Sequence, residues 1–150
     1  MRRTFACLYL SLCAVLLAGC SWTVPFFVVN NTAVPRSLEI HLSEQQKGFL
    51  IFNPRQFALL PWSDGAADYE RKKDLPTAWH EHLTVEIPPY SALQIGYLSN
   101  DKYESSSQKF INDRVFNLVL LKAGKSEVTR ETFDRHFQKT SRGIVWVLPQ

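Results

Sequence analysis

The segment His80-Glu81-His82 has the side chains and the spacing of a metal site. Residues i and i+2 of a β-strand point to the same face, so both imidazoles could reach one ion such as zinc. Glu86 lies farther along that face, and His41 lies on the polar face of another predicted strand. If the two strands are neighbours, a third ligand is within reach. The competing interpretation is a solvated face, because a half-buried strand alternates polar and apolar residues without any ligand.

Aromatic residues near predicted loops form the second candidate site. Trp62 follows Pro61 at the end of an apolar run, and Tyr69 and Tyr90 lie in or beside loops. Aromatic side chains at such positions are favoured in protein interfaces and can stack on sugars. Two interpretations of Trp62 are open: contact with a partner, and closure of one end of the core.

The sequence does not contain the common catalytic patterns. There is no Gly-x-Ser-x-Gly elbow, and His80-x-His82 is two residues shorter than the zinc-protease spacing. Asp64, Asp68 and Glu70 lie in a predicted polar loop, where a tuned acid–base pair is hard to hold. The chain is therefore predicted to be a non-enzyme without a cofactor, and a hydrolase of envelope polymers is the least favoured alternative.

The first 20 residues carry the most specific pattern in the chain. Arg2 and Arg3 precede an apolar run over residues 5–18 that only Ser11 interrupts. At about 14 residues, this run has the length of a secretory signal segment and falls short of the ~20 residues of a membrane-spanning helix. It leads into the sequence Leu16-Leu17-Ala18-Gly19-Cys20.

This ending resembles the lipobox of bacterial lipoproteins. The resemblance implies a signal peptide of residues 1–19, cleavage before Cys20, and a thioether-linked diacylglyceryl group on the Cys20 thiol. Acylation of the new amino terminus usually follows in that family. The resemblance also implies that the lipid bilayer is a partner and that the mature chain belongs to the cell envelope. Ser21 stands where Asp would mark inner-membrane retention, which favours the outer membrane.

Composition and length limit the functions and folds open to the mature chain of residues 20–150. Two of the 17 basic residues are Arg2 and Arg3, which leaves 15 basic side chains against 14 acidic ones. This balance gives no electrostatic reason to expect nucleic-acid binding. Cys7 and Cys13 lie in the predicted signal peptide and Cys20 would be acylated, so no disulfide is expected. The length suits one domain with one core.

The pattern of apolar residues predicts the strands. Alternation is clearest in residues 36–42 and 79–87, and further strands are expected at 22–29, 92–98, 115–121 and 144–148. The nearly all-apolar run 115–121 suggests a central strand covered on both faces. Residues 63–76 are predicted to form a polar loop. A helix of about nine residues is expected after an N-cap at Thr129, with Phe133 and Phe137 on one face.

These elements predict a mainly β fold, an antiparallel β-sandwich with one short C-terminal helix. Its shape would be similar to that of immunoglobulin or transthyretin domains, and a closed β-barrel is the alternative. The expected function is a non-catalytic binding or scaffolding module for another envelope component, with an envelope protein as partner. The alternative is a small-ligand or metal-binding lipoprotein.

Overall fold

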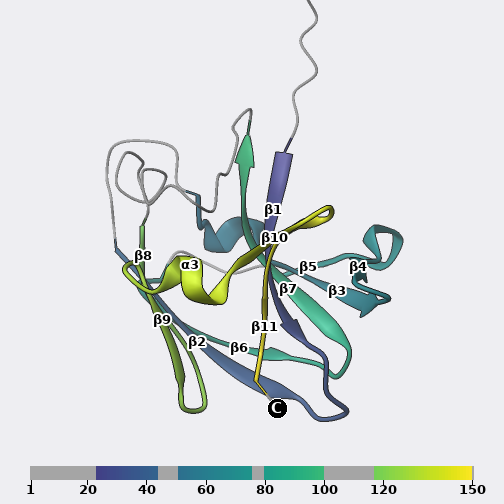
Figure 1. Cartoon of the computed structure of the whole chain (residues 1–150), viewed down its shortest axis with the longest axis horizontal. Helices are drawn as coiled ribbons and strands as arrows, with labels where there is room; N and C mark the ends of the chain where they lie inside the picture. The colour runs from purple at the N-terminus through teal and green to yellow at the C-terminus, as the bar shows by residue number, and fades with distance from the viewer. Residues whose placement is uncertain (1–22, 44–50, 76–79, 100–116, 150) are drawn as a thin grey trace, which may run out of the picture.

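The computed structural model describes residues 23–43, 51–75, 80–99 and 117–149. The fold is mainly β, with two sheets and one short helix (Figure 1). The elements in chain order are β1 (Thr23–Asn30), β2 (Arg36–Leu42), η1 (Pro54–Gln56), β3 (Ala58–Ser63), β4 (Ala66–Ala67), η2 (Tyr69–Arg71), β5 (Lys73–Asp74), β6 (His82–Ile87), β7 (Ser91–Ser99), β8 (Leu118–Ala123), β9 (Ser126–Thr129), α3 (Phe133–His136), β10 (Gln138–Thr140) and β11 (Gly143–Val147).

The strands form two sheets, which we call sheet A and sheet B. Sheet A has the order β10-β11-β1-β7-β3-β4, with β5 also paired to β3, and sheet B has the order β6-β2-β8-β9. Sheet A curls into a half-barrel, a shape consistent with a sandwich or a barrel-like fold. One pair differs from the predicted antiparallel arrangement, because β1 and β11 are parallel. Parallel neighbours need a long connection, and nearly the whole chain lies between these two strands.

The main core lies between the two sheets. It includes Phe26 and Val28 of β1 and Leu38 and Ile40 of β2, all at most 1% exposed. Five aromatic rings fill its centre, since Phe26 contacts Phe52, Phe133 and Phe137, and Trp146 packs against Phe137. The predicted alternation of β2 is confirmed, with Leu38, Ile40 and Leu42 buried.

A second apolar layer covers the opposite face of sheet A, which we call the outer face. Residues alternate across a strand, so Phe27 and Val29 point away from the main core. They join residues of three other strands in a buried group that we call the outer cluster: Phe27, Val29, Ala58, Leu60, Ala92 and Val145. Trp62 and Ala67 pack against it. The segment 63–76 was predicted to be a loop, but its described part, residues 63–75, contains β4, η2 and β5.

The helix is shorter than predicted and begins later. Thr129 ends β9, and the N-cap of α3 is Thr132, whose side chain makes no capping hydrogen bond. The Thr132 hydroxyl instead accepts a hydrogen bond from the Thr129 backbone N–H at 2.8 Å. The predicted pairing of Phe133 and Phe137 is confirmed, because both are buried and their rings stack with centroids 4.2 Å apart.

Strand β8 is covered on one face only, which corrects the prediction for residues 115–121. The strand lies inside sheet B between β2 and β9, but Val119 is 51% exposed. Leu118, Leu121 and Ala123 point into the core. Residues 115 and 116 lie outside the described residues.

Two buried asparagines hold the loops to the sheets. The Asn30 amide nitrogen donates to the carbonyls of Val34, Ile87 and Pro88 at 2.8–3.0 Å. Asn117 bonds both the N–H and the C=O of Phe52 through its side chain. At Gly96, a Cβ would lie 2.1 Å from the Ile51 carbonyl oxygen, so the close approach of that segment requires glycine.

Candidate functional site

The structure pairs His82 with His41 and places His80 outside the strand. β6 begins at His82, so the same-face argument for His80 and His82 does not apply, and Trp79 lies outside the described residues. The premise that the two strands are neighbours is confirmed: His41 and His82 are register partners with ring centroids 4.4 Å apart. Among the residues that the structure describes, no group of three or more His, Cys, Asp or Glu side chains could hold a metal ion. Metal binding at His80 and His82 stays a prediction.

Trp62 lies on β3 and is partly buried. Its ring packs edge-to-face on Phe27, with centroids 5.6 Å apart. Its backbone N–H donates to the Tyr90 carbonyl at 2.8 Å, which ties β3 to the turn between β6 and β7. Trp62 thus closes one end of the outer cluster and leaves part of its ring at the surface.

Three exposed apolar or aromatic residues lie next to residues of the outer cluster or to Trp62. Tyr69 and Tyr90 are each 54% exposed, and Val147 is 53% exposed. The Tyr69 ring lies 6.4 Å from that of Phe27, and partial burial raises the pKa of its hydroxyl above the usual 10. Val147 is the register partner of Val29. We call Trp62, Tyr69, Tyr90 and Val147 the aromatic edge.

A pocket of about 510 Å³ lies elsewhere on the molecule, around the side chains of Gln94 and Tyr97 of β7. Its volume is within the range of roughly 300–1,000 Å³ typical of small-ligand sites. It is lined by Arg55, Gln56, Lys72, Asp74, Leu75, Gln94 and Tyr97. Gln94 is the register partner of both Phe27 and Ala58, so it points to the outer face.

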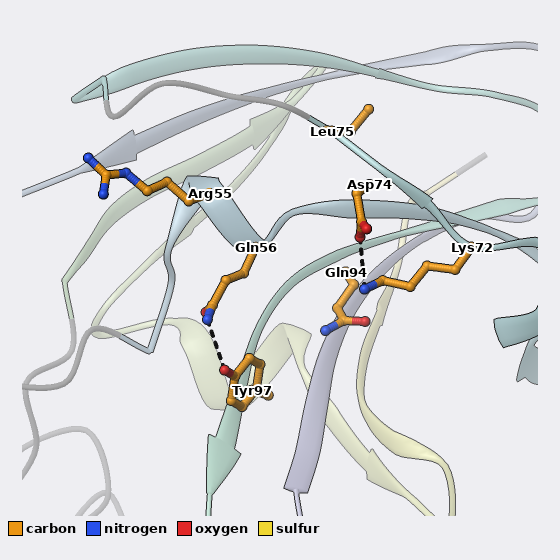
Figure 2. Close-up of a pocket in the computed structure, with 7 residues that line it drawn as sticks. All are labelled: Arg55, Gln56, Lys72, Asp74, Leu75, Gln94 and Tyr97. Carbon is orange, nitrogen blue, oxygen red and sulfur yellow. Dashed lines mark hydrogen bonds and ion pairs between the residues drawn. The ribbon is translucent and has the colours of Figure 1, made fainter.

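The polar groups of the pocket converge on one space. Figure 2 shows Gln56, Gln94 and Tyr97 pointing toward one another, while the Arg55 guanidinium points away. The Gln56 amide nitrogen donates to the Tyr97 hydroxyl at 2.9 Å. The Lys72 ammonium pairs with the Asp74 carboxylate at 2.8 Å. The Gln94 side-chain oxygen is buried and has no hydrogen-bond partner among the described residues.

Two short capped turns position this lining. The Asn53 side chain accepts a hydrogen bond from the Arg55 N–H and caps η1, which places Gln56. The Asp68 carboxylate caps η2 at the Glu70 N–H and bonds the Arg71 guanidinium, which places Lys72. The hydrogen bond with Arg71 lowers the pKa of the Asp68 carboxyl below its usual range.

Cys20 and Ser21 lie outside the described residues, so the structure places neither. The first described strand, β1, begins three positions after Cys20, at Thr23. Among the helices described, none has the length and apolar character needed to cross a bilayer.

The three comparisons with known proteins found no relative. No family model matches the chain, and neither the curated proteins nor the solved structures include a significant match.

Gln94 and Tyr97 are site residues that were not predicted. Both lie within the strand predicted over residues 92–98, and no role was expected of them. A signal was present, because Gln94 lies between Leu93 and Ile95 in an otherwise apolar run. A lone amide in such a run indicates either a buried hydrogen bond or a ligand contact.

Proposed function

We propose that this chain is a lipid-anchored protein of the bacterial cell envelope that acts as a non-catalytic binding module for another envelope protein. The lipobox resemblance at Cys20 supports the anchor. The start of β1 at Thr23 leaves two residues between the acylated position and the fold. The aromatic edge supplies the binding surface.

The conformation of Tyr90 carries this proposal. Its backbone has φ = 50°, a left-handed conformation that costs a bulky L-residue about 1–2 kcal/mol. Asn or Gly would adopt this conformation with less strain, as Asp64 and Gly65 do in another turn. Strained residues of this kind cluster at ligand clamps. Tyr90 is also 54% exposed, so core packing alone does not explain an aromatic ring there.

Its neighbours suit a protein partner. Trp62 contacts Tyr90 through the backbone, and Tyr69 extends the same end of the outer cluster. Tyr and Trp side chains contribute most of the binding energy in many protein interfaces. The rings of Trp62 and Tyr69 both pack against the buried Phe27, which restricts their motion and limits the conformational entropy lost on binding.

Site-specific photocrosslinking in cells tests the binding surface. A benzophenone amino acid replaces Tyr90, where it keeps an aromatic ring, and in a matched control it replaces Val119. Val119 is similarly exposed but lies on sheet B. We expect one protein adduct of defined mass from position 90 and none from position 119. Equal adducts from both positions, or none from position 90, would contradict the proposal.

Mass spectrometry of the amino-terminal peptide tests the anchor separately. We expect a peptide that begins at Cys20 and carries the mass of a diacylglyceryl group, and we expect its loss in Cys20→Ser. A free Cys20 thiol in the membrane-extracted protein would rule the anchor out.

A further inference from the structure

We infer that the pocket around Gln94 binds a neutral saccharide. This site lies toward the other end of β7 from Tyr90, and the inference depends neither on the aromatic edge nor on the lipid anchor.

The first argument is the state of the Gln94 carboxamide. Gln94 is 9% exposed, and its side-chain oxygen has no partner among the described residues. Buried polar groups in folded proteins are nearly always hydrogen-bonded, and an unbonded one destabilises the fold. A ligand donor at this position would satisfy the group. Whichever way the carboxamide is turned, it presents an acceptor on one side and a donor on the other.

The second argument is the hydrogen-bonding character of the other groups. The Tyr97 hydroxyl accepts from Gln56, so its own O–H remains available to donate. Amides and hydroxyls each donate and accept, and so does every hydroxyl of a sugar. The Tyr97 ring adds apolar surface to the same pocket, against which the C–H groups of a sugar ring can pack.

The third argument is charge. The Lys72 ammonium is already neutralised by the Asp74 carboxylate, and the Arg55 guanidinium points away from the other groups. An anionic ligand that reached Lys72 would lie beside the Asp74 carboxylate and be repelled by it. A neutral ligand leaves the pair intact. The concave shape also suits a compact ring, whereas an extended peptide is usually bound along a strand edge or a groove.

Calorimetric titration of the purified full chain in detergent tests this inference. The probes are two neutral trisaccharides, N,N′,N″-triacetylchitotriose and maltotriose. Glucose is the monosaccharide arm, and trigalacturonate and trialanine are the anionic and peptide arms. We expect at least one neutral trisaccharide to bind with Kd at or below about 1 mM, which is an affinity that a few hydrogen bonds provide. Binding of glucose with equal affinity would identify a free sugar, and trisaccharide preference would identify a chain unit.

Two variants separate the site from the rest of the fold. Gln94→Met removes the carboxamide and keeps the side-chain length, and we expect it to weaken saccharide binding about 10-fold or more. Gln138→Met makes the same chemical change at an exposed position of β10 and should leave Kd unchanged. The thermal transition of each variant shows that it is folded.

Three results would overturn the inference. They are no heat from either neutral trisaccharide at about 10 mM, tighter binding of trigalacturonate or trialanine, and an unchanged Kd in folded Gln94→Met. None of these results bears on the adduct expected at position 90, so failure here is distinguishable from failure of the proposed protein partner.

Discussion

Replacing Gln94 with Met should make the unliganded protein more stable. The Gln94 side chain is 9% exposed on the outer face of sheet A, and its carboxamide oxygen lacks a hydrogen bond among the described residues. Met has a similar length, is flexible enough to fill an irregular gap, and carries no group that needs a strong hydrogen bond. The substitution therefore removes a buried polar group without opening a cavity.

The expected gain follows from the cost of the unbonded group. An unsatisfied buried donor or acceptor costs about 1–3 kcal/mol, and an apolar replacement of the same shape is nearly neutral or stabilising. Because only one acceptor is unbonded, we place the gain near the lower end, at about 1 kcal/mol. For a chain of this size, that gain raises the melting temperature by roughly 3–6 °C.

Urea denaturation of the two methionine variants measures this effect. Gln94→Met should shift the midpoint upward with an unchanged slope, which indicates a change in stability rather than in exposed surface. Gln138→Met on β10 is exposed and should stay within about 0.5 kcal/mol of the parent protein. If Gln94→Met loses more than about 1 kcal/mol while Gln138→Met is neutral, the carboxamide makes stabilising bonds and the reasoning is refuted.

Three further substitutions probe the aromatic edge and the loop anchors. Tyr90→Gly should stabilise the protein by about 0.5–1 kcal/mol in thermal unfolding, because glycine adopts φ = 50° without strain; a loss would show that the ring packs productively. Trp62→Ala should cost about 2–3 kcal/mol, less than a fully buried Trp, because it removes the contact with Phe27; an unchanged melting temperature would assign Trp62 to the surface alone. Asn30→Ala should cost about 3 kcal/mol or more by urea denaturation, because three backbone carbonyls lose their donor; a cost under about 1 kcal/mol would mean that water replaces the amide.

Local patterns predicted the strands well because period-two alternation directly reflects burial. β2 and β6 follow that alternation, and both lie within a few residues of their predicted bounds. Val119 shows the limit of the method, because a run of apolar residues does not reveal whether one face or both are covered. Thr129 shows a second limit. A threonine that suits a helix N-cap can equally end a strand, and here Thr129 ends β9 while Thr132 is the N-cap of α3.

The pocket could not be predicted, because it depends on pairings between distant segments. Gln94 lines the same pocket as Lys72 and Gln56 because β3 pairs with β7 along one edge and with β5 along its other edge. Residues 63–76 are too polar to show the apolar pattern from which such strand pairings could be predicted. His41 and His82 are neighbours for a similar reason: they lie on different strands, and the sequence does not show that those strands pair.

Sheet register relates both candidate sites to the proposed lipid anchor at Cys20. β1 and β7 are antiparallel, so Pro25 pairs with Tyr97, Phe27 pairs with Gln94, and Asn30 pairs with Ser91 beside Tyr90. Extended chain spans at most about 3.6 Å per residue, which limits Phe27 to about 25 Å from Cys20 and Asn30 to about 36 Å. If Cys20 is acylated, the β1 residue beside Gln94 therefore lies within about 25 Å of the acylated residue, and the β1 residue beside Ser91 lies within about 36 Å of it. Such tethering fixes the concentration of the pocket at the membrane, so a millimolar affinity would suffice for a membrane-attached glycan.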